Sequence, residues 1–197
     1  MKKHKKHTNI SKRNNGNFAP NEVAILGTNC GVIENLVQQV STKLSNYNLA
    51  YFDASHAKDL EQNRLSEYTF HHKGNLEIKT FSNVNKFLQR LQFAQHDFVF
   101  INGNHYAGSK QIVILDPEKE ASINKRIEQI SDIQFFIKTT KEVGVFQSLK
   151  DKFQDWNEIP QYEIDDIKKI TNHICQLLEK TIPNLNGLVL VGGKSTR

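Results

Sequence analysis

The chain has 197 residues, of which 38% are hydrophobic and 24% are charged. This length leaves room for one ordinary domain of up to about 180 residues and a further segment, and the composition excludes a chain that is disordered throughout. No apolar run approaches the roughly 20 residues that cross a bilayer, so we expect a soluble protein with no membrane partner.

The formal net charge of +5 comes from the N-terminal end of the chain. Lysine and arginine crowd the first thirteen residues, and the remainder is nearly neutral. We predict that residues 1–20 form a basic disordered tail without a nucleic-acid partner, because no aromatic platform accompanies the charges. Cys30 and Cys175 are the two cysteines, and they are far apart in sequence, which is typical of unpaired thiols in a reducing cytoplasm.

The first predicted unit is a strand, a glycine loop and a helix. Residues 23–26 are a short apolar run, and residues 27–31 read Gly-Thr-Asn-Cys-Gly. Apolar residues then recur at helical spacing to about residue 45. This order predicts the opening of an α/β nucleotide-binding domain.

The loop departs from a working phosphate loop at the positions that carry the chemistry. The pattern G-x-x-x-x-G-K-[ST] supplies a lysine for the phosphates and a hydroxyl for Mg²⁺. If Gly31 stands for the second glycine, Val32 takes the lysine position and Ile33 the hydroxyl position, and the loop is one residue short. We therefore predict a degenerate loop, marked by Gly27 and Gly31, that keeps the shape of a phosphate site but does not hydrolyse a nucleotide.

The chain from there to residue 182 alternates predicted strands and helices. Residues 68–72 and 76–81 are expected to form a hairpin. The fold class that this order predicts is α/β, with a mostly parallel sheet flanked by helices in a P-loop or Rossmann-like three-layer arrangement. The further strands are expected at residues 49–53, 97–101, 111–115, 133–137 and 162–164, and the further helices at 84–95, 118–130, 142–153 and 167–178.

Two pairs of potential metal ligands are interpreted as exposed or packing residues. His71 and His72 are neighbours in the predicted hairpin, and adjacent residues of a strand point to opposite faces. His173 and Cys175 lie two apart on the last predicted helix and point in different directions. No metal site is expected from either pair.

Polar residues follow several of the predicted strands. Asp53, Asn102, Asn104, His105 and Asp116 would gather along one edge if the sheet is parallel. Such an edge predicts a polar cleft for a ligand with hydroxyl or amide groups. The alternative interpretation is that loops at strand ends are polar in any case. The sequence places no nucleophile beside a base, so the catalytic residues are unknown.

The last stretch, residues 185–197, indicates a strand that delivers a second phosphate loop. The apolar run 188–191 leads into glycines, a lysine, a serine and an arginine. This stretch resembles the opening L-x-G-G-x-S-x-R of the MobA-like NTP transferase family. The matched residues are Leu190, Gly192, Gly193, Ser195 and Arg197.

The resemblance implies transfer of a nucleotidyl group, typically GMP from GTP onto molybdopterin, with Mg²⁺. It implies that the backbone of residues 190–193 holds the nucleotide and that Ser195 and Arg197 line its triphosphate. The downstream lysine and the metal-binding aspartate of that family are not in this sequence. We therefore expect residues 185–197 to be the truncated start of a Rossmann-like transferase domain, inactive by itself.

Residues 21–182 are similar in outline to the MobB-type GTP-binding fold, as a degenerate P-loop domain without the Lys-Ser/Thr pair. Two interpretations stay open. In one, the chain is the N-terminal part of a two-domain cytoplasmic nucleotidyltransferase, with nucleotide and molybdopterin as partners. In the other, it is a non-catalytic pseudo-P-loop module that binds a nucleotide or a protein, and the final strand closes its sheet.

Overall fold

The structure of the protein is a computed structural model that describes residues 18–54, 67–71, 76–79 and 86–180. A six-stranded sheet in the order β2-β5-β1-β6-β7-β8 forms its centre, and every pair of neighbouring strands in it is parallel. The predicted fold class is thus confirmed. The strands are β1 (Glu22–Leu26), β2 (Leu49–Phe52), β5 (Phe98–Asn102), β6 (Gln111–Leu115), β7 (Ile133–Lys138) and β8 (Gln161–Glu163).

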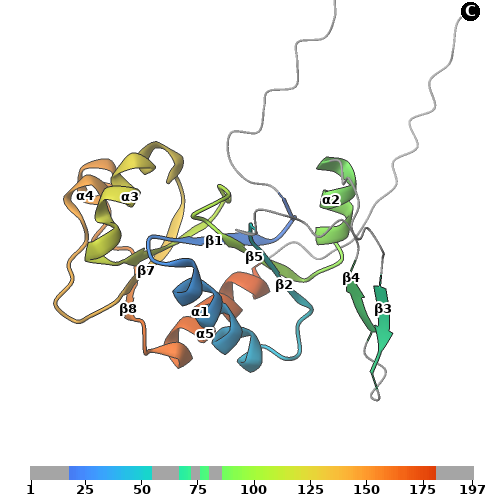
Figure 1. The fold of residues 1–197 in the computed structure, drawn as a ribbon. Helices are drawn as coiled ribbons and strands as arrows, with labels where there is room; N and C mark the ends of the chain where they lie inside the picture. The colour runs from blue at the N-terminus through green and yellow to red at the C-terminus, as the bar shows by residue number, and fades with distance from the viewer. Residues whose placement is uncertain (1–17, 55–66, 72–75, 80–85, 181–197) are drawn as a thin grey trace, which may run out of the picture.

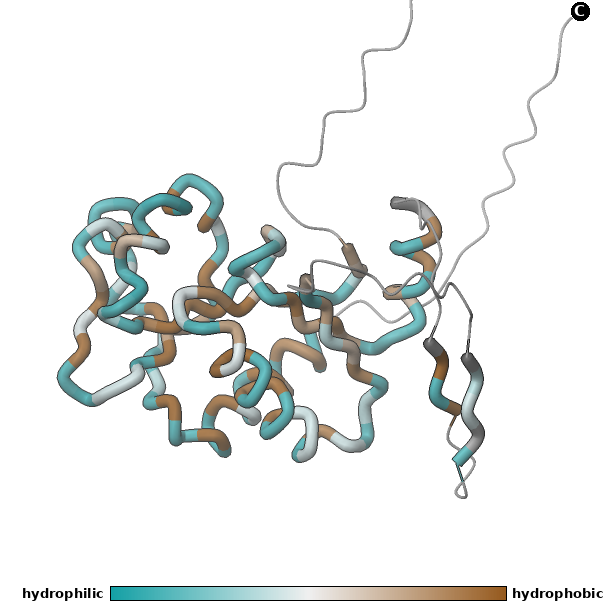
Figure 2. Tube along the Cα trace, viewed as in Figure 1, coloured by the Kyte–Doolittle hydropathy of each residue, from teal (hydrophilic) through white to brown (hydrophobic). Residues whose placement is uncertain are grey.

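Helices cover both faces of the sheet (Figure 1). On one face lie α1 (Cys30–Lys43) and α5 (Ile167–Glu179), and on the other lie α3 (Glu120–Lys125) and α4 (Gln147–Lys152). Side chains alternate along each strand, so that Val23 and Ile25 of β1 join the core under α1 and α5, while Leu26 joins the core under α3 and α4. Because both faces are covered, the central strands β1, β5 and β6 are apolar except at one end of each, where Glu22, Asn102 and Gln111 lie, and Figure 2 shows them mostly brown.

A third core cluster covers the β2 side of the sheet. It contains Val99 and Ile101 of β5, with Phe52 and Tyr106 stacked at a ring distance of 4.4 Å. Helix α2 (Lys86–Phe93) contributes Phe93, whose ring centroid lies 5.0 Å from that of Phe52. These aromatic rings lie on the β2 side of the sheet edge that is described below.

The predicted hairpin is present as β3 (Glu67–Phe70) and β4 (Leu76–Lys79), an antiparallel pair beside the main sheet (Figure 1). His71 is exposed, with Nε2 at 3.4 Å from Glu77 Oε2, and His72 lies outside the described residues. On α5, His173 Nδ1 lies 2.9 Å from the Tyr162 hydroxyl, and burial lowers the pKa of its imidazole. His173 thus packs against Tyr162 and Phe135, which is one of the two roles expected for it.

Two predicted helices are wrong in their extent. The helix expected at 118–130 is broken into a 3-10 turn η1 (Pro117–Lys119), α3 and a second turn η2 (Ile127–Gln129). The helix expected at 142–153 begins only at Gln147. Val145 and Phe146 are both buried in the core under α3 and α4, and Phe146 has extended backbone, with φ −66° and ψ 147°, so the helix begins only after it. Gly144, just before them, favours helix poorly.

No helix in the described part of the chain is long and apolar enough to cross a bilayer.

Candidate phosphate site at the sheet edge

The carboxyl ends of β1, β2, β5 and β6 meet at one edge of the parallel sheet. The chain visits β2 and β5 on one side of β1 and then crosses to β6 on the other, and ligands of open α/β sheets bind where the strand order reverses in this way. A pocket of about 290 Å³ opens there. It is lined by Gly27, Thr28, Asn29, Cys30, Asn104, His105, Lys119, Ser122 and Arg126.

The loop after β1 is held in one shape by its first glycine. Gly27 has φ +101°, a conformation that side-chain-bearing residues rarely adopt. A Cβ on Gly27 would collide with the Ile114 carbonyl and lie 2.8 Å from Ile123 Cδ1. Asn104 fixes the loop from the other side, because its Nδ2 donates to the Thr28 carbonyl at 2.7 Å and its Oδ1 accepts from the Gly27 N–H at 3.4 Å.

Helix α1 begins at the pocket with open backbone donors. The Asn29 carbonyl accepts from the N–H groups of Val32 and Ile33, at 3.0 and 3.2 Å, and the Asn29 side chain caps nothing. The N–H groups of Cys30 and Gly31 have no acceptor among the described residues. Unpaired N–H groups at a helix N-terminus attract anions.

The positions of the missing lysine and hydroxyl are part of the protein interior. Ile33 is fully buried in the core under α1, and Val32 is half-buried. Neither side chain can bind Mg²⁺ or neutralise a phosphate. The residues of this loop therefore do not fit the metal site of a P-loop NTPase.

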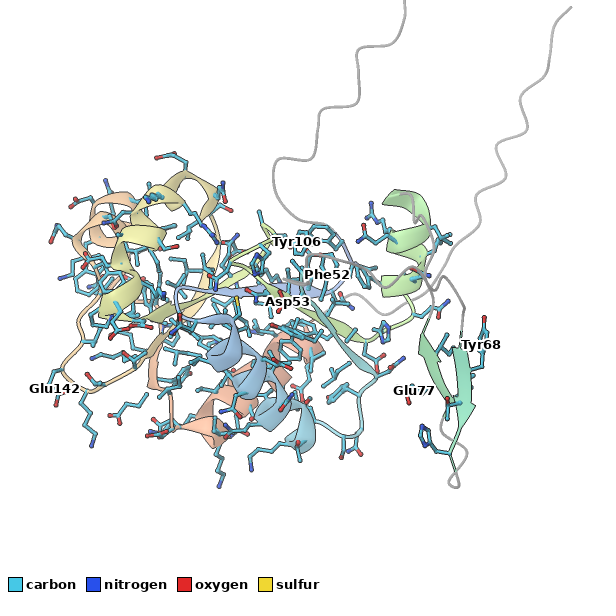
Figure 3. The ribbon with its side chains drawn as sticks, viewed as in Figure 1. Phe52, Asp53, Tyr68, Glu77, Tyr106 and Glu142 are labelled. Atoms are coloured by element: carbon cyan, nitrogen blue, oxygen red, sulfur yellow. The ribbon has the colours of Figure 1, made fainter. Side chains whose placement is uncertain are left out.

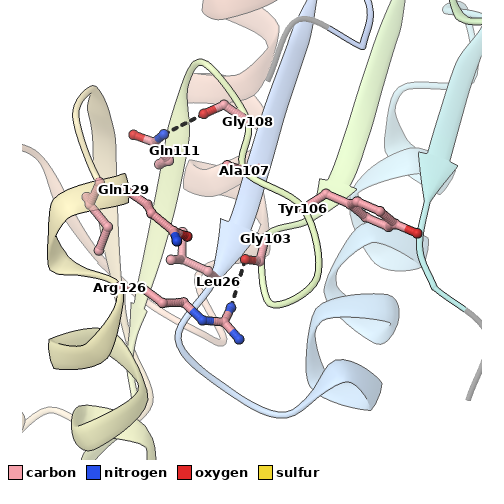
Figure 4. Close-up of a pocket in the computed structure, with 10 residues that line it drawn as sticks. Leu26, Gly103, Tyr106, Ala107, Gly108, Gln111, Arg126 and Gln129 are labelled. Carbon is pink, nitrogen blue, oxygen red and sulfur yellow. Dashed lines mark hydrogen bonds between the residues drawn. The ribbon is translucent and has the colours of Figure 1, made fainter. Parts of the chain in front are cut away.

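Two cations and a serine that the sequence did not indicate also line the pocket. Lys119, Ser122 and Arg126, here called the cationic face, come from the connection between β6 and β7. Arg126 Nη1 donates to the Gly103 carbonyl at 3.0 Å, as Figure 4 shows. Lys119 has no carboxylate within ion-pair distance among the described residues. Lys119, Ser122 and Arg126 follow Asp116 at the spacing i, i+3 and i+7, which is the sequence pattern of residues that share one face of a helix.

Asp116 lies at this edge, as predicted from its place after β6, but both of its oxygens serve the fold. Its Oδ2 accepts from the Thr28 hydroxyl at 2.7 Å, and its Oδ1 accepts from the Glu118 N–H at 3.1 Å. Thr28 is only 3% exposed. Asp116 thus caps η1 and anchors the loop after β1.

Asp53 and Asn102 meet on the other side of β1, near Tyr51. We call these three residues the acidic cluster. Asp53 Oδ2 accepts from the Tyr51 hydroxyl at 2.9 Å and from Asn102 Nδ2 at 3.0 Å, and Oδ1 accepts from the Ala54 N–H at 2.6 Å. Figure 3 shows Asp53 next to the rings of Phe52 and Tyr106.

The pKa values of the acidic cluster follow from these bonds. Burial by itself would raise the pKa of Asp53, but the hydrogen bonds from Asn102, Ala54 and Tyr51, with the nearby His105, outweigh it and hold that pKa below its usual value. Burial raises the pKa of Tyr51, and the Asp53 carboxylate raises it further. Asp53 is therefore a well-satisfied carboxylate at neutral pH.

His105 lies between the two sides of the edge. Its Nε2 is 3.3 Å from Cys30 Sγ and 3.8 Å from Asp53 Oδ1. The sequence had not placed a thiol beside a base. Because both neighbours face the same ring nitrogen, the arrangement differs from a relay in which an acid orients the base through its other nitrogen. Within the described part of the chain, no three His, Cys, Asp or Glu residues could hold a metal ion.

The second predicted phosphate loop cannot be placed. Leu190, Gly192, Gly193, Ser195 and Arg197 lie outside the described residues, as does most of the predicted basic tail. Their roles stay predictions.

Comparison with known proteins shows the fold. No family model matches the chain, and no curated protein matches it. Among solved structures, it resembles a molybdopterin-guanine biosynthesis protein B, MobB, with a TM-score of 0.53 and 15% identity over 81% of this chain and 99% of that one. Bacillus subtilis MobB matches with a TM-score of 0.55 and 15% identity, over 81% of this chain and 98% of that one. A MobB homologue from Bacillus stearothermophilus matches with a TM-score of 0.52 and 11% identity, over 80% of this chain and 97% of that one. The similarity predicted to the MobB-type fold is thus confirmed.

Proposed function

We propose that this domain binds the phosphate groups of a nucleotide at the loop of residues 27–31, without hydrolysing them, in the biosynthesis of the molybdenum cofactor. The pocket carries this proposal. It joins Cys30, whose backbone N–H is open at the start of α1, to two cationic side chains, and none of the described residues that line it is a carboxylate. The likeness to proteins described as molybdopterin-guanine biosynthesis protein B supports the pathway.

Binding without hydrolysis follows from the residues at the start of α1. Phosphoryl transfer requires a metal ion that bridges phosphate oxygens and a residue that orients the attacking water. Val32 and Ile33 provide no group for the metal, and the Asp116 carboxylate beside the pocket already accepts from Thr28 and Glu118. A bound nucleotide would therefore be held and not turned over.

Calorimetric titration with GTP, GDP and ATP tests the proposal, alongside an assay of phosphate release. We expect GTP or GDP to bind, and phosphate release to stay at the level of a sample without protein. Absence of binding at millimolar nucleotide would refute the binding role, and release above that level would refute the non-hydrolytic one.

A second candidate function concerns residues 185–197. The motif Gly-Gly-Lys-Ser-Thr-Arg after an apolar run supports a role as the N-terminal part of a nucleotidyltransferase resembling molybdenum cofactor guanylyltransferase. GTP would then be a substrate and Mg²⁺ would act in the complete transferase domain. The domain of residues 21–182 would be its accessory part.

This second candidate predicts that the chain alone is inactive, because one strand and loop supply neither substrate positioning nor metal ligands. The purified chain can be incubated with GTP, Mg²⁺ and molybdopterin. Nucleotidyl product above background would contradict the view that catalysis needs a larger domain.

A further inference from the structure

We propose that the cationic face replaces the missing loop lysine, so that the pocket takes a diphosphate group without a metal ion. This inference rests on the proposed phosphate role of the loop and adds the class of ligand and the residues that select it. Lys119, Ser122 and Arg126 line the same pocket as Gly27 and Cys30. The pocket therefore brings the start of α1 together with two side-chain cations.

The local structure directs the cationic face toward the loop. Asp116 starts η1 by accepting from the Glu118 N–H, and the same carboxylate binds Thr28 of the loop. These two hydrogen bonds to the Asp116 carboxylate tie the first turn of the connection to the loop, so Lys119 and Ser122 follow at a fixed distance from the loop. Ile123, between them and Arg126, is 1% exposed and anchors α3 in the core.

The two cations differ in how they are held. The Arg126 guanidinium is fixed by the Gly103 carbonyl at 3.0 Å and keeps further N–H donors. Lys119 is half-buried and has no acidic partner among the described residues. A cation that is half-buried without a counter-ion is favourably placed to receive an anion from solution.

The residues around the pocket also argue against a metal-bound ligand. In P-loop NTPases, a loop lysine and Mg²⁺ together neutralise the phosphates. Here the described residues place no carboxylate in the pocket lining, and a divalent cation would meet Lys119 and Arg126. Mg²⁺ prefers carboxylate and phosphate oxygens. The pocket therefore suits a phosphate group that has not bound Mg²⁺.

The size of the pocket limits how much of the ligand enters it. Its volume of about 290 Å³ is at the lower end of the range of roughly 300–1,000 Å³ for small-molecule sites. This space suits a diphosphate group, as in pyrophosphate or the end of a nucleoside diphosphate, with the nucleoside outside.

Titration of the full chain with pyrophosphate in EDTA tests the inference. Lys119→Met is compared with Lys125→Met, which removes the same charge from an exposed position of α3, and with Lys119→Arg, which keeps the charge. We expect Lys119→Met to weaken pyrophosphate binding by about ten- to a hundred-fold, because a charge-assisted contact is lost, while Lys125→Met changes it little and Lys119→Arg keeps most of it.

Ser122→Asp provides a second variant that leaves Lys119 in place and puts a carboxylate into the pocket. It should weaken pyrophosphate binding at least as strongly, and thermal unfolding confirms that each variant is folded. The inference is overturned if pyrophosphate does not bind the wild type, if binding requires Mg²⁺, if Lys119→Met behaves like Lys125→Met, or if Ser122→Asp binds like the wild type.

The same titrations separate this inference from the proposed function. If GDP binds but Lys119→Met has no effect on its affinity, the nucleotide role stands and the cationic face is not its phosphate partner. If pyrophosphate binds through Lys119 but GDP and GTP do not bind, the phosphate pocket stands and the proposed nucleotide role does not.

Discussion

The acidic cluster and the cationic face lie on opposite sides of the loop after β1, and their side chains are engaged differently. In the acidic cluster, the Asp53 carboxylate accepts three hydrogen bonds from its own surroundings. In the cationic face, Lys119 has no acidic partner in the described part of the chain, and the helix N-terminus in front of it has open N–H groups. Polar residues that satisfy one another stabilise the fold, whereas polar residues that leave donors open can receive a ligand.

The loop between the two sides should be the most sensitive point. Gly27→Ala should lower the free energy of unfolding by about 2–4 kcal/mol, because the backbone has φ +101° and the new Cβ would meet the Ile114 carbonyl. Urea unfolding measures this change. Gly31→Ala is the matched control, because nothing lies within 4 Å of its added Cβ. Equal losses in the two variants would mean that the loop is not fixed by Gly27.

Asp53→Asn should cost stability and spare ligand binding. We expect a loss of about 1–2 kcal/mol at neutral pH, because the charge-assisted bonds from Tyr51, Asn102 and Ala54 are weakened. Pyrophosphate affinity should stay near that of the wild type. A large loss of pyrophosphate affinity with little loss of stability would show that Asp53 binds the ligand. The contrast between the acidic cluster and the cationic face would then be wrong.

The pH dependence of this effect has a definite sign. The pKa of Asp53 is lower in the folded chain than the unfolded value of about 4, so its contribution is fully present above about pH 4 and is lost as the pH falls through the folded pKa. Urea unfolding between about pH 6 and pH 3 should show a smaller slope in Asp53→Asn.

Asn104 connects the loop to the end of β5, and its removal should have a moderate effect. Asn104→Ala loses the bond to the Thr28 carbonyl and the bond from the Gly27 N–H, which predicts a loss of about 1 kcal/mol. It should also weaken pyrophosphate binding, because the loop donors are less well oriented. Asn29→Ala, in the same loop but without a capping bond, should leave stability nearly unchanged.

The smallest expected effect is on the alkylation rate of the two cysteines, and both rates can be measured in the same molecule. Cys30 lines the pocket, whereas Cys175 lies near Tyr47, with its Sγ 3.8 Å from that hydroxyl. Pyrophosphate should slow alkylation of Cys30 by a neutral maleimide and leave the rate at Cys175 unchanged. Peptide mass spectrometry separates the two sites. Equal protection of both thiols, or of neither, would place the ligand elsewhere.

Much of the fold could be predicted because buried parallel strands are short apolar runs. Residues 111–115 were predicted as the strand that the structure contains, and the gathering of Asp53 and Asn102 followed from their places after two neighbouring strands. A local sequence pattern does not show which polar groups already have hydrogen-bond partners in the folded chain. The hydrogen bonds of Asp53 come from Tyr51, Asn102 and Ala54, and only the folded chain shows that they converge on one carboxylate.

The cationic face was missed for a related reason. The apolar pattern of residues 118–130 predicts one continuous helix, whereas the structure has a break on each side of α3. A phosphate-loop pattern also places its lysine directly after the second glycine of the loop, so it does not indicate a lysine from another connection. Lys119 enters the same pocket from the other side of the sheet edge, ninety-two positions after Gly27.

Amide chemical shifts during a pyrophosphate titration test the contrast between the two sides most directly. We expect the largest shifts at Gly27, Cys30 and Gly31 in the loop and at Lys119, with small shifts at Ala54 beside the acidic cluster. Largest shifts at Ala54 and Asn102, with the loop unaffected, would contradict the assignment of phosphate binding to the cationic side.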